Sequence, residues 1–155
     1  MDRLEIEHVL ESCELFKGLD RSEIERISGL CHVETYDAGD EVFCQGDCSE
    51  NIYVIAEGYV FLERSMDLGL RKGKVTIGIL GKGRAFGCWS TLLNQVHNLM
   101  SSAICQKPTK VVIMKETDLR DVMTTNTKFG FDVLEKLCLL LRDRIQGAFG
   151  AMEKI

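Results

Sequence analysis

Features that indicate a membrane or secreted protein are missing from this chain. It contains a single proline, and no apolar run approaches the ~20 residues that a membrane-spanning helix needs. The amino terminus, MDRLEIEHVLES, is charged and amphipathic and lacks the apolar segment of a signal peptide. We therefore expect a cytoplasmic protein that makes no contact with a membrane.

Concentrated positive charge is missing too. The net charge is −5, and Lys and Arg are scattered along the chain. The densest basic cluster, Arg71-Lys72-Gly73-Lys74, is predicted to be an exposed hairpin tip. This distribution excludes an extended basic surface for nucleic acid.

Motifs of the common catalytic and metal-binding sites are also absent from the sequence. There is no HExxH, no serine nucleophile elbow, no P-loop and no GxGxxG. The seven cysteines are an odd number and contain no CxxC pair, so without a secretion signal we expect reduced thiols. We therefore expect no catalytic residue, no metal site and no enzymatic activity.

What is present is the composition of one globular domain. The chain has 155 residues, of which 45% are hydrophobic and 28% charged, and no repeat divides it. We expect a single domain over residues 1–155, with helices at 3–30, a β-rich region at 31–115 and helices at 116–153. Asp20 and Glu23 have the spacing of a capping box, which predicts the start of the second helix.

The central region has the pattern of short strands. After Cys31, β-branched and aromatic residues alternate with glycine-containing turns at short intervals. Regular short strands joined by such turns are typical of antiparallel barrels and sandwiches. The predicted fold is therefore mainly β with flanking helices, and we expect its strands to form an antiparallel barrel.

The last predicted helix carries two apolar stripes. The first has the alternating spacings of three and four of a coiled-coil heptad, and it consists of Phe131, Leu134, Cys138, Leu141, Ile145, Ala148 and Met152. The second consists of Val133, Leu137 and Leu140. A helix with two apolar faces needs two partners, so we expect one face on the domain and a homodimer through the heptad. Packing wholly on its own domain is the alternative, and Gly147 and Gly150 weaken the helix.

Four segments, taken in order, carry the pattern of a known family. They are LFKGL at 15–19, YDAGDEVFCQGD at 36–47, IYVIAEGYV at 52–60 and GRAFG at 83–87. Together they resemble the cyclic-nucleotide-binding domain of catabolite activator proteins and of kinase regulatory subunits. The resemblance covers about residues 10–145. It implies a β-roll or jelly roll, with two helices at each end and a pocket beside a phosphate-binding cassette.

The cassette, expected at residues 86–102, departs from the family pattern at two positions. The family has a Glu after Phe-Gly for the ribose hydroxyl, and this chain has Cys88. The family has an Arg for the cyclic phosphate, and this chain has Leu99 or, after a one-residue slip, Met100. The resemblance implies a short helix over 89–93 whose amides face an anion. The pocket residues that it implies are Phe86, Gly87, Cys88, Trp89, Ser90, Leu99, Met100, Ser101 and Ser102.

These departures predict a pocket that binds cyclic AMP or cyclic GMP weakly. A buried phosphodiester needs a cation of fork geometry, and His97 is the only possible cation between Phe86 and Gln106. We expect a non-enzymatic regulatory or sensor domain, with no cofactor firmly implied, that signals through its C-terminal helix. The alternative is a ligand-free interaction or dimerisation module whose pocket is filled by its own side chains.

The expected effector is a separate protein. Transcription factors of the family place a helix-turn-helix after the dimer helix, and none follows here. DNA binding by this chain alone is therefore not expected, unless the sequence is a fragment of a longer protein.

A thiol-based redox sensor is a further alternative. Cys88 is predicted at a helix N-terminus, where the pKa of a thiol falls, and Cys44 and Cys48 lie close together in a predicted turn. The more ordinary role of such cysteines is that of small buried hydrophobic residues.

Overall fold

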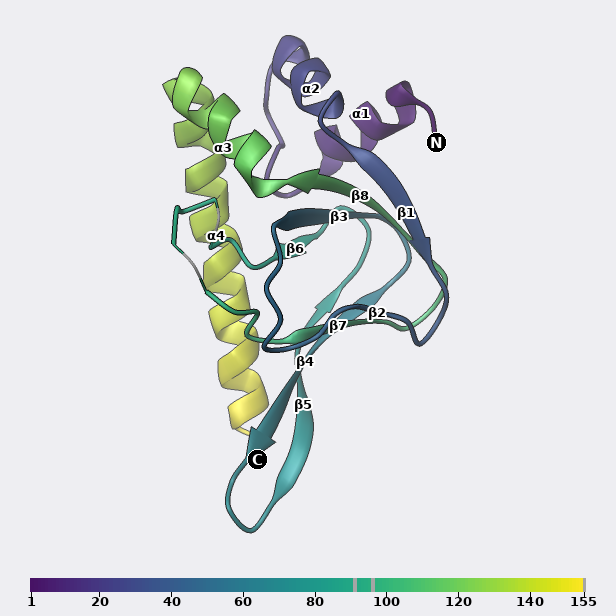
Figure 1. Ribbon diagram of the computed structural model, residues 1–155, viewed down its shortest axis with the longest axis vertical. Helices are drawn as coiled ribbons and strands as arrows, with labels where there is room; N and C mark the ends of the chain where they lie inside the picture. Colours follow the sequence, from purple (N-terminus) through teal and green to yellow (C-terminus); the bar gives the residue numbers. More distant parts are fainter. Residues whose placement is uncertain (91, 96, 155) are drawn as a thin grey trace.

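The computed structural model describes residues 1–90, 92–95 and 97–154. Within these ranges two helices precede a run of short strands, and two further helices follow it (Figure 1). The helices are α1 (Arg3–Ser12), α2 (Arg21–Ser28), α3 (Glu116–Thr125) and α4 (Thr127–Met152). The strands are β1 (His32–Tyr36), β2 (Glu41–Phe43), β3 (Asn51–Glu57), β4 (Val60–Asp67), β5 (Lys72–Leu80), β6 (Ala85–Gly87), β7 (Ser102–Cys105) and β8 (Thr109–Lys115).

The strands form two antiparallel sheets. Their orders are β1-β8-β3-β6 and β2-β7-β4-β5. The predicted class, mainly β with flanking helices, is confirmed. The predicted barrel needs correction, because the described strands pair only within their own sheet and the two sheets do not close. The second sheet extends beyond the first as a long β4–β5 hairpin, which projects from the body of the molecule (Figure 1).

Strand β3 lies at the centre of the core because both of its faces are buried. Ile52 and Val54 belong to a cluster with the helices, whereas Tyr53 and Ile55 belong to a second cluster between the sheets. The alternation follows from the strand period of two residues, which sends neighbouring side chains to opposite faces. A strand buried on both faces has a continuous apolar run, as IYVIA at residues 52–56 does.

The amino-terminal helices close one side of the first cluster. The helix expected from about residue 3 to residue 16 ends at Ser12, and Phe16 packs into the core from the following turn. The predicted cap of the second helix is present, because the Glu23 carboxylate accepts a hydrogen bond from the Asp20 N–H at 3.1 Å. This contact satisfies a backbone donor that would otherwise have no partner at the helix end.

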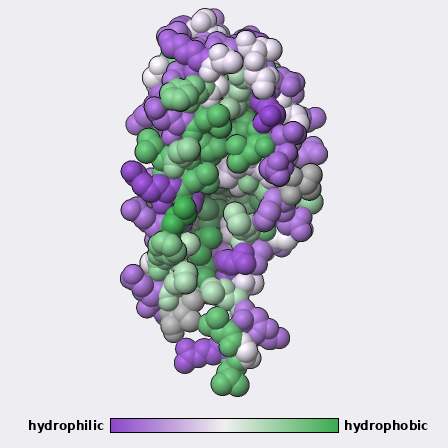
Figure 2. All heavy atoms as spheres, turned by 90° about the vertical axis from the view of Figure 1, so that its left-hand side faces the viewer, coloured by the Kyte–Doolittle hydropathy of each residue, from purple (hydrophilic) through white to green (hydrophobic). Residues whose placement is uncertain are grey.

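Helix α4 has the two apolar faces that the heptad analysis predicts. Val133, Leu137 and Leu140 are buried against the domain, whereas Phe131 and Ile145 are more than half exposed. Figure 2 shows an apolar band on the side of the molecule where α4 lies. None of the described helices, α4 included, combines the length and apolar character that crossing a membrane requires.

Gly147 explains how α4 approaches strand β5. A Cβ atom added at this residue would lie 2.4 Å from the Ile77 carbonyl oxygen, closer than any side chain allows. The glycine therefore lets the helix backbone rest on the strand, and its low helix propensity has a structural reason. Gly150, one turn later, has no atom within 4 Å of such a Cβ.

Candidate functional site

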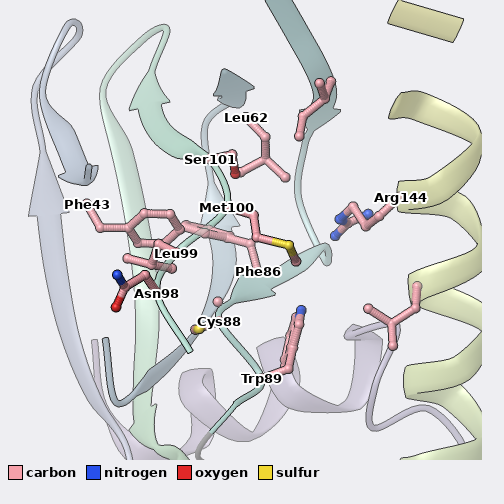
Figure 3. A pocket seen from close by; sticks show the side chains of 13 residues that line it. Phe43, Leu62, Phe86, Cys88, Trp89, Asn98, Leu99, Met100, Ser101 and Arg144 are labelled. Carbon is pink, nitrogen blue, oxygen red and sulfur yellow. The ribbon is translucent and has the colours of Figure 1, made fainter. Parts of the chain in front are cut away.

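A cavity of about 110 Å³ lies between the cassette segment and helix α4 (Figure 3). Seven of the nine predicted pocket residues line it, namely Phe86, Gly87, Cys88, Trp89, Leu99, Met100 and Ser101. The other two, Ser90 and Ser102, do not. Ligand pockets commonly measure about 300–1,000 Å³, so the side chains of this chain occupy much of the space.

Aromatic side chains fill the space beneath the cavity. Phe86 stacks on Tyr53, with ring centroids 5.1 Å apart, and contacts Phe43 at 5.8 Å. Phe86 is 1% exposed. Phe43 and Phe86 also line the cavity, so one wall is a rigid apolar surface.

The predicted short helix over residues 89–93 is absent from the described part of that segment. Ser90 and residues 92–94 form turns, closed by a hydrogen bond from the Leu93 N–H to the Trp89 carbonyl at 3.1 Å. Trp89 has a φ of 65°, in the left-handed region that residues with a Cβ seldom adopt. No helix N-terminus therefore faces the cavity here, and the indole ring is turned into the cavity wall.

A buried glutamate on α3 holds this turn in place through a hydrogen bond. Glu116 begins α3, is 0% exposed, and accepts a hydrogen bond from the Trp89 N–H at 2.9 Å. The Trp89 amide, expected to face an anionic ligand, thus already has a hydrogen-bond acceptor within the chain. Gly87 also serves the fold itself, because a Cβ there would lie 2.9 Å from the Asn51 carbonyl oxygen of the paired strand.

Leu99 and Met100, the two candidates for the position where the resemblance implies an Arg, have different surroundings. Leu99 is 4% exposed and its backbone is fixed between Gly46 and Asp47 by two hydrogen bonds of 2.8 Å. Met100 is 62% exposed, and its carbonyl accepts a hydrogen bond from Arg64. Neither position brings a charge to the cavity.

The side chains of Ser102, Cys88 and Ser90 form hydrogen bonds within the chain. The Ser102 hydroxyl accepts a hydrogen bond from the Gln45 N–H at 2.9 Å. The Cys88 thiol lies 3.1 Å from the Ser90 hydroxyl and donates to the His97 carbonyl at 3.3 Å. Because no helix begins at Cys88, the reason for expecting a reactive thiol there is lost.

The other cysteines give no support to a redox or metal site. A hydrogen bond to Glu41 is the main cause of a raised pKa of the Cys44 thiol, and the neighbouring Cys48 thiol instead donates to Asn98 at 3.3 Å. Burial raises the pKa of Cys13 to about 12 and that of Cys31 to about 12. Across the described residues, no three metal-binding side chains come together.

Helix α4 supplies the one positive charge among the described residues that line the cavity. The Arg144 side chain is 17% exposed and donates a hydrogen bond to the Ala85 carbonyl of β6. Desolvation by burial lowers the pKa of Arg144, and the nearby Glu14 carboxylate opposes that shift. In Figure 3 this side chain reaches from α4 toward Met100 and Phe86.

Sequence reasoning missed Arg144, although the sequence contains a signal for it. Val133, Leu137 and Leu140 are followed by Arg144 at the next position of the same stripe, with spacings of four, three and four. A charged residue in a buried stripe needs a partner or a function. The resemblance places the cation within the cassette, where His97 is the candidate, whereas Arg144 lies on the last helix.

The family comparison agrees with this architecture. The family model described as "Cyclic nucleotide-binding domain" matches residues 33–126. The chain belongs to the cyclic nucleotide-binding domain family. A curated relative, the cAMP-dependent protein kinase type II regulatory subunit of Drosophila melanogaster, is 32% identical over 81 residues. That match covers 52% of this chain and 20% of the relative, so the two share only a part of the relative's length.

Solved structures of the family have the same fold. A cyclic nucleotide-binding domain from Methylobacillus flagellatus matches with a TM-score of 0.79 at 20% identity, covering 99% of this chain and 84% of that one. The catabolite activator protein of Thermus thermophilus matches with a TM-score of 0.71 at 26% identity, covering 90% and 62%. The chain therefore has the family fold over nearly its whole described length.

Proposed function

We propose that this chain is a non-enzymatic regulatory domain that binds cyclic AMP and cyclic GMP only weakly and signals through helix α4. The observation that carries the proposal is the cavity itself. It measures about 110 Å³, and among the described residues that line it the cassette side has no charged side chain and the one cation comes from α4. The kinase regulatory subunit and the catabolite activator protein among its relatives support a regulatory role.

Weak binding of a cyclic nucleotide follows from the missing side chains. Cys88 stands where the family pattern has the carboxylate, and Leu99 or Met100 stands where it has the guanidinium. Each lost charge-assisted hydrogen bond costs about 1.5–3 kcal/mol, which corresponds to about 10- to 100-fold in affinity. The family ligand is also larger than the space available.

Transmission through α4 is supported by its contacts. Leu141 and Arg144 line the cavity, and Gly147 holds the next turn against β5. A change in the contents of the cavity therefore acts directly on the helix. On its other face α4 exposes Ile145 and Met152, so a movement of the helix would alter the surface that a partner contacts.

The partner that we propose for this face is a second copy of the chain. The exposed residues Phe131, Leu134 and Ile145 lie on the heptad, and Leu141 and Ala148 between them are half-buried. A regular heptad suits self-association better than contact with an irregular surface. The signal would then pass to a separate effector protein.

Calorimetric titration with cyclic AMP and cyclic GMP tests the ligand part of this proposal. We expect dissociation constants weaker than about 1 mM, because both charge-assisted contacts are missing. Binding of either nucleotide at micromolar concentration would overturn the proposal.

Sedimentation tests the dimer. We expect the wild-type chain to be a dimer, and Ile145→Glu to be monomeric because it buries a charge in the heptad. Gln146→Glu is the matched control, since Gln146 is an exposed neighbour outside the heptad. A monomeric wild type at high micromolar concentration, or an Ile145→Glu variant that remains a dimer, would contradict the proposal.

A ligand-free module is the second candidate function. The small cavity and the internally bound cassette groups favour it. The experiment of the next subsection separates the two, because a ligand-free module binds no small molecule at Trp89 and Arg144.

A further inference from the structure

We infer that the cavity binds a small organic carboxylate, whose anionic group is held by Arg144 and whose apolar part lies against Phe86 and Leu99. The inference rests on the proposed function of this pocket as a regulatory site, and it names the chemical class of ligand. Three observations carry it: an excess of positive charge, hydrogen-bond donors directed to one place, and the size and lining of the space.

The charge beside the cavity is not balanced. Glu14 Oε2 accepts hydrogen bonds from Arg84 Nε and from the Ala85 N–H, each at 2.8 Å. The same oxygen lies 3.8 Å from Arg144 Nη2, too far for a hydrogen bond. Two guanidinium groups thus share one carboxylate that is committed to Arg84. Because a guanidinium stays protonated in proteins, one positive charge remains next to an apolar cavity.

Other acidic groups near Arg144 do not remove this excess. Asp143 lies beside it on α4, but its carboxylate is nearly half exposed and lies 3.5 Å from Arg142. Glu116 is buried on the other side of the cassette turn, where it binds the Trp89 N–H, and it does not line the cavity. A monoanionic ligand would supply the missing charge.

Two side chains present donors to the same space. Arg144 forms one hydrogen bond, through Nη2 to the Ala85 carbonyl, among the residues that the structure describes. The remaining donors of its planar fork can bind a carboxylate. The Trp89 indole forms no hydrogen bond in the described part of the chain, and its nitrogen lies at the end of the ring nearer Arg144 (Figure 3). An anion between them would accept from both.

The strained backbone of Trp89 supports a role in binding. Its φ of 65° is unusual for a residue with a Cβ, and such strain tends to occur at ligand sites. The Glu116 contact holds the backbone in this conformation, and the indole is thereby presented to the cavity.

The volume and the apolar lining of the cavity favour a small carboxylate over a phosphate as its ligand. The cavity of about 110 Å³ is lined mainly by Phe43, Leu62, Phe86, Leu99 and other apolar side chains. A cavity of about 150 Å³ holds one benzene molecule, so an acid with a chain of a few carbons matches the space. A phosphate at the cassette could not bind the Trp89 N–H, because that group already donates to Glu116, and it would lie close to this buried carboxyl group.

The experiment uses the intrinsic probe of the site. Trp89 is the only tryptophan in the chain, so its single indole N–H resonance reports on the cavity alone. The full-length protein is titrated with butyrate, with the neutral isostere butyramide, and with cyclic AMP. We expect butyrate to shift the indole resonance with a dissociation constant of about 1 mM, since small ligands bind weakly. Butyramide is expected to bind at least about tenfold more weakly, because it lacks the charge.

Three variants test the role of Arg144. Arg144→Gln is expected to weaken butyrate binding by about tenfold or more, and Arg144→Lys by several-fold, because Lys keeps the charge but loses the fork. Lys128→Gln is the matched control on the same helix, and it should bind butyrate like the wild type, since that residue is exposed and outside the cavity. If Arg144→Gln does not fold, the Arg144→Lys result decides.

Several outcomes would overturn the inference. These are no indole shift with butyrate, an equal shift with butyramide, or unchanged butyrate affinity in Arg144→Lys and in a folded Arg144→Gln. Failure of the proposed function has a different signature, which is binding of cyclic AMP at micromolar concentration by the same sample. The two failures are therefore distinguishable in one set of titrations.

Discussion

The cavity has a cassette edge, formed by residues 86–102, and a helix edge, formed by Leu141 and Arg144 of α4. The polar groups of the two edges differ in their hydrogen bonding. On the cassette edge three of these groups bind within the chain: the Trp89 N–H to Glu116, the Cys88 thiol to the His97 carbonyl, and the Ser102 hydroxyl to the Gln45 N–H. On the helix edge Arg144 makes a single hydrogen bond among residues 1–90, 92–95 and 97–154, and no group in these ranges fully compensates its charge.

The difference indicates where recognition can occur in this member of the family. Groups that already have good partners gain little by exchanging them for a ligand, because protein and ligand hydrogen bonds are similar in strength. Groups with spare donors in a low-dielectric site gain much more. The contrast therefore favours the helix edge, the edge through which we propose that a signal passes.

The largest effect is expected from enlarging the cavity on the cassette edge. Phe86→Ala removes a side chain that is 1% exposed and should reduce the free energy of unfolding by about 3–5 kcal/mol. Denaturant unfolding measures this loss. Met100 lines the same cavity but is 62% exposed. Met100→Ala should therefore change the free energy of unfolding by less than about 1 kcal/mol. If both variants lost the same free energy of unfolding, Phe86 would not form a rigid wall of the cavity.

A pair of glycine variants tests the helix edge. Gly147→Ala places a Cβ 2.4 Å from the Ile77 carbonyl oxygen, so the helix must move away from β5. We expect a destabilisation of about 1–3 kcal/mol, as for overpacking, and a shift of the Trp89 indole resonance. Gly150→Ala meets no atom within 4 Å and should stabilise the protein by up to about 1 kcal/mol. Stabilisation by both variants would refute the close contact between α4 and β5.

Restoring the family side chains should have the smallest effect. Cys88→Glu combined with Met100→Arg reintroduces a carboxylate and a guanidinium at the cassette. Each of these contacts is worth about 10- to 100-fold where the pocket admits the ligand. We nevertheless expect cyclic AMP affinity to rise by less than about tenfold, because Glu116 still holds the Trp89 amide and Leu99 still fills the space that the ligand needs. Calorimetry of the double variant measures this. A gain of about a thousandfold would show that the cassette edge lacks only these two side chains.

The fold could be predicted from local patterns, because they repeat along the chain. The strands and the two stripes of α4 follow from periods of two and 3.6 residues, which the sequence displays directly. The sequence predicted a helix over residues 89–93, but the described part of this segment forms turns, and Glu116, distant in sequence, accepts a hydrogen bond from the Trp89 N–H there. Arg144 lies 55 residues after Trp89, so only the folded chain shows that both line one cavity.

The glycines illustrate the same limit. From the sequence, Gly147 is only a residue of low helix propensity. The structure shows its role, because a side chain there would collide with the Ile77 carbonyl oxygen. Gly87 matches the place where a ligand phosphate would approach, yet its contact with Asn51 gives it a role in the sheet. A close approach between segments distant in sequence leaves no local signal.

The indole resonance of Trp89 gives the most direct test of recognition by the helix edge. One sample is titrated first with cyclic AMP and then with butyrate, and the Arg144→Gln variant is treated in the same way. The account predicts a shift with butyrate that Arg144→Gln abolishes, and no shift with cyclic AMP at micromolar concentration. A shift with micromolar cyclic AMP that survives in Arg144→Gln would contradict it.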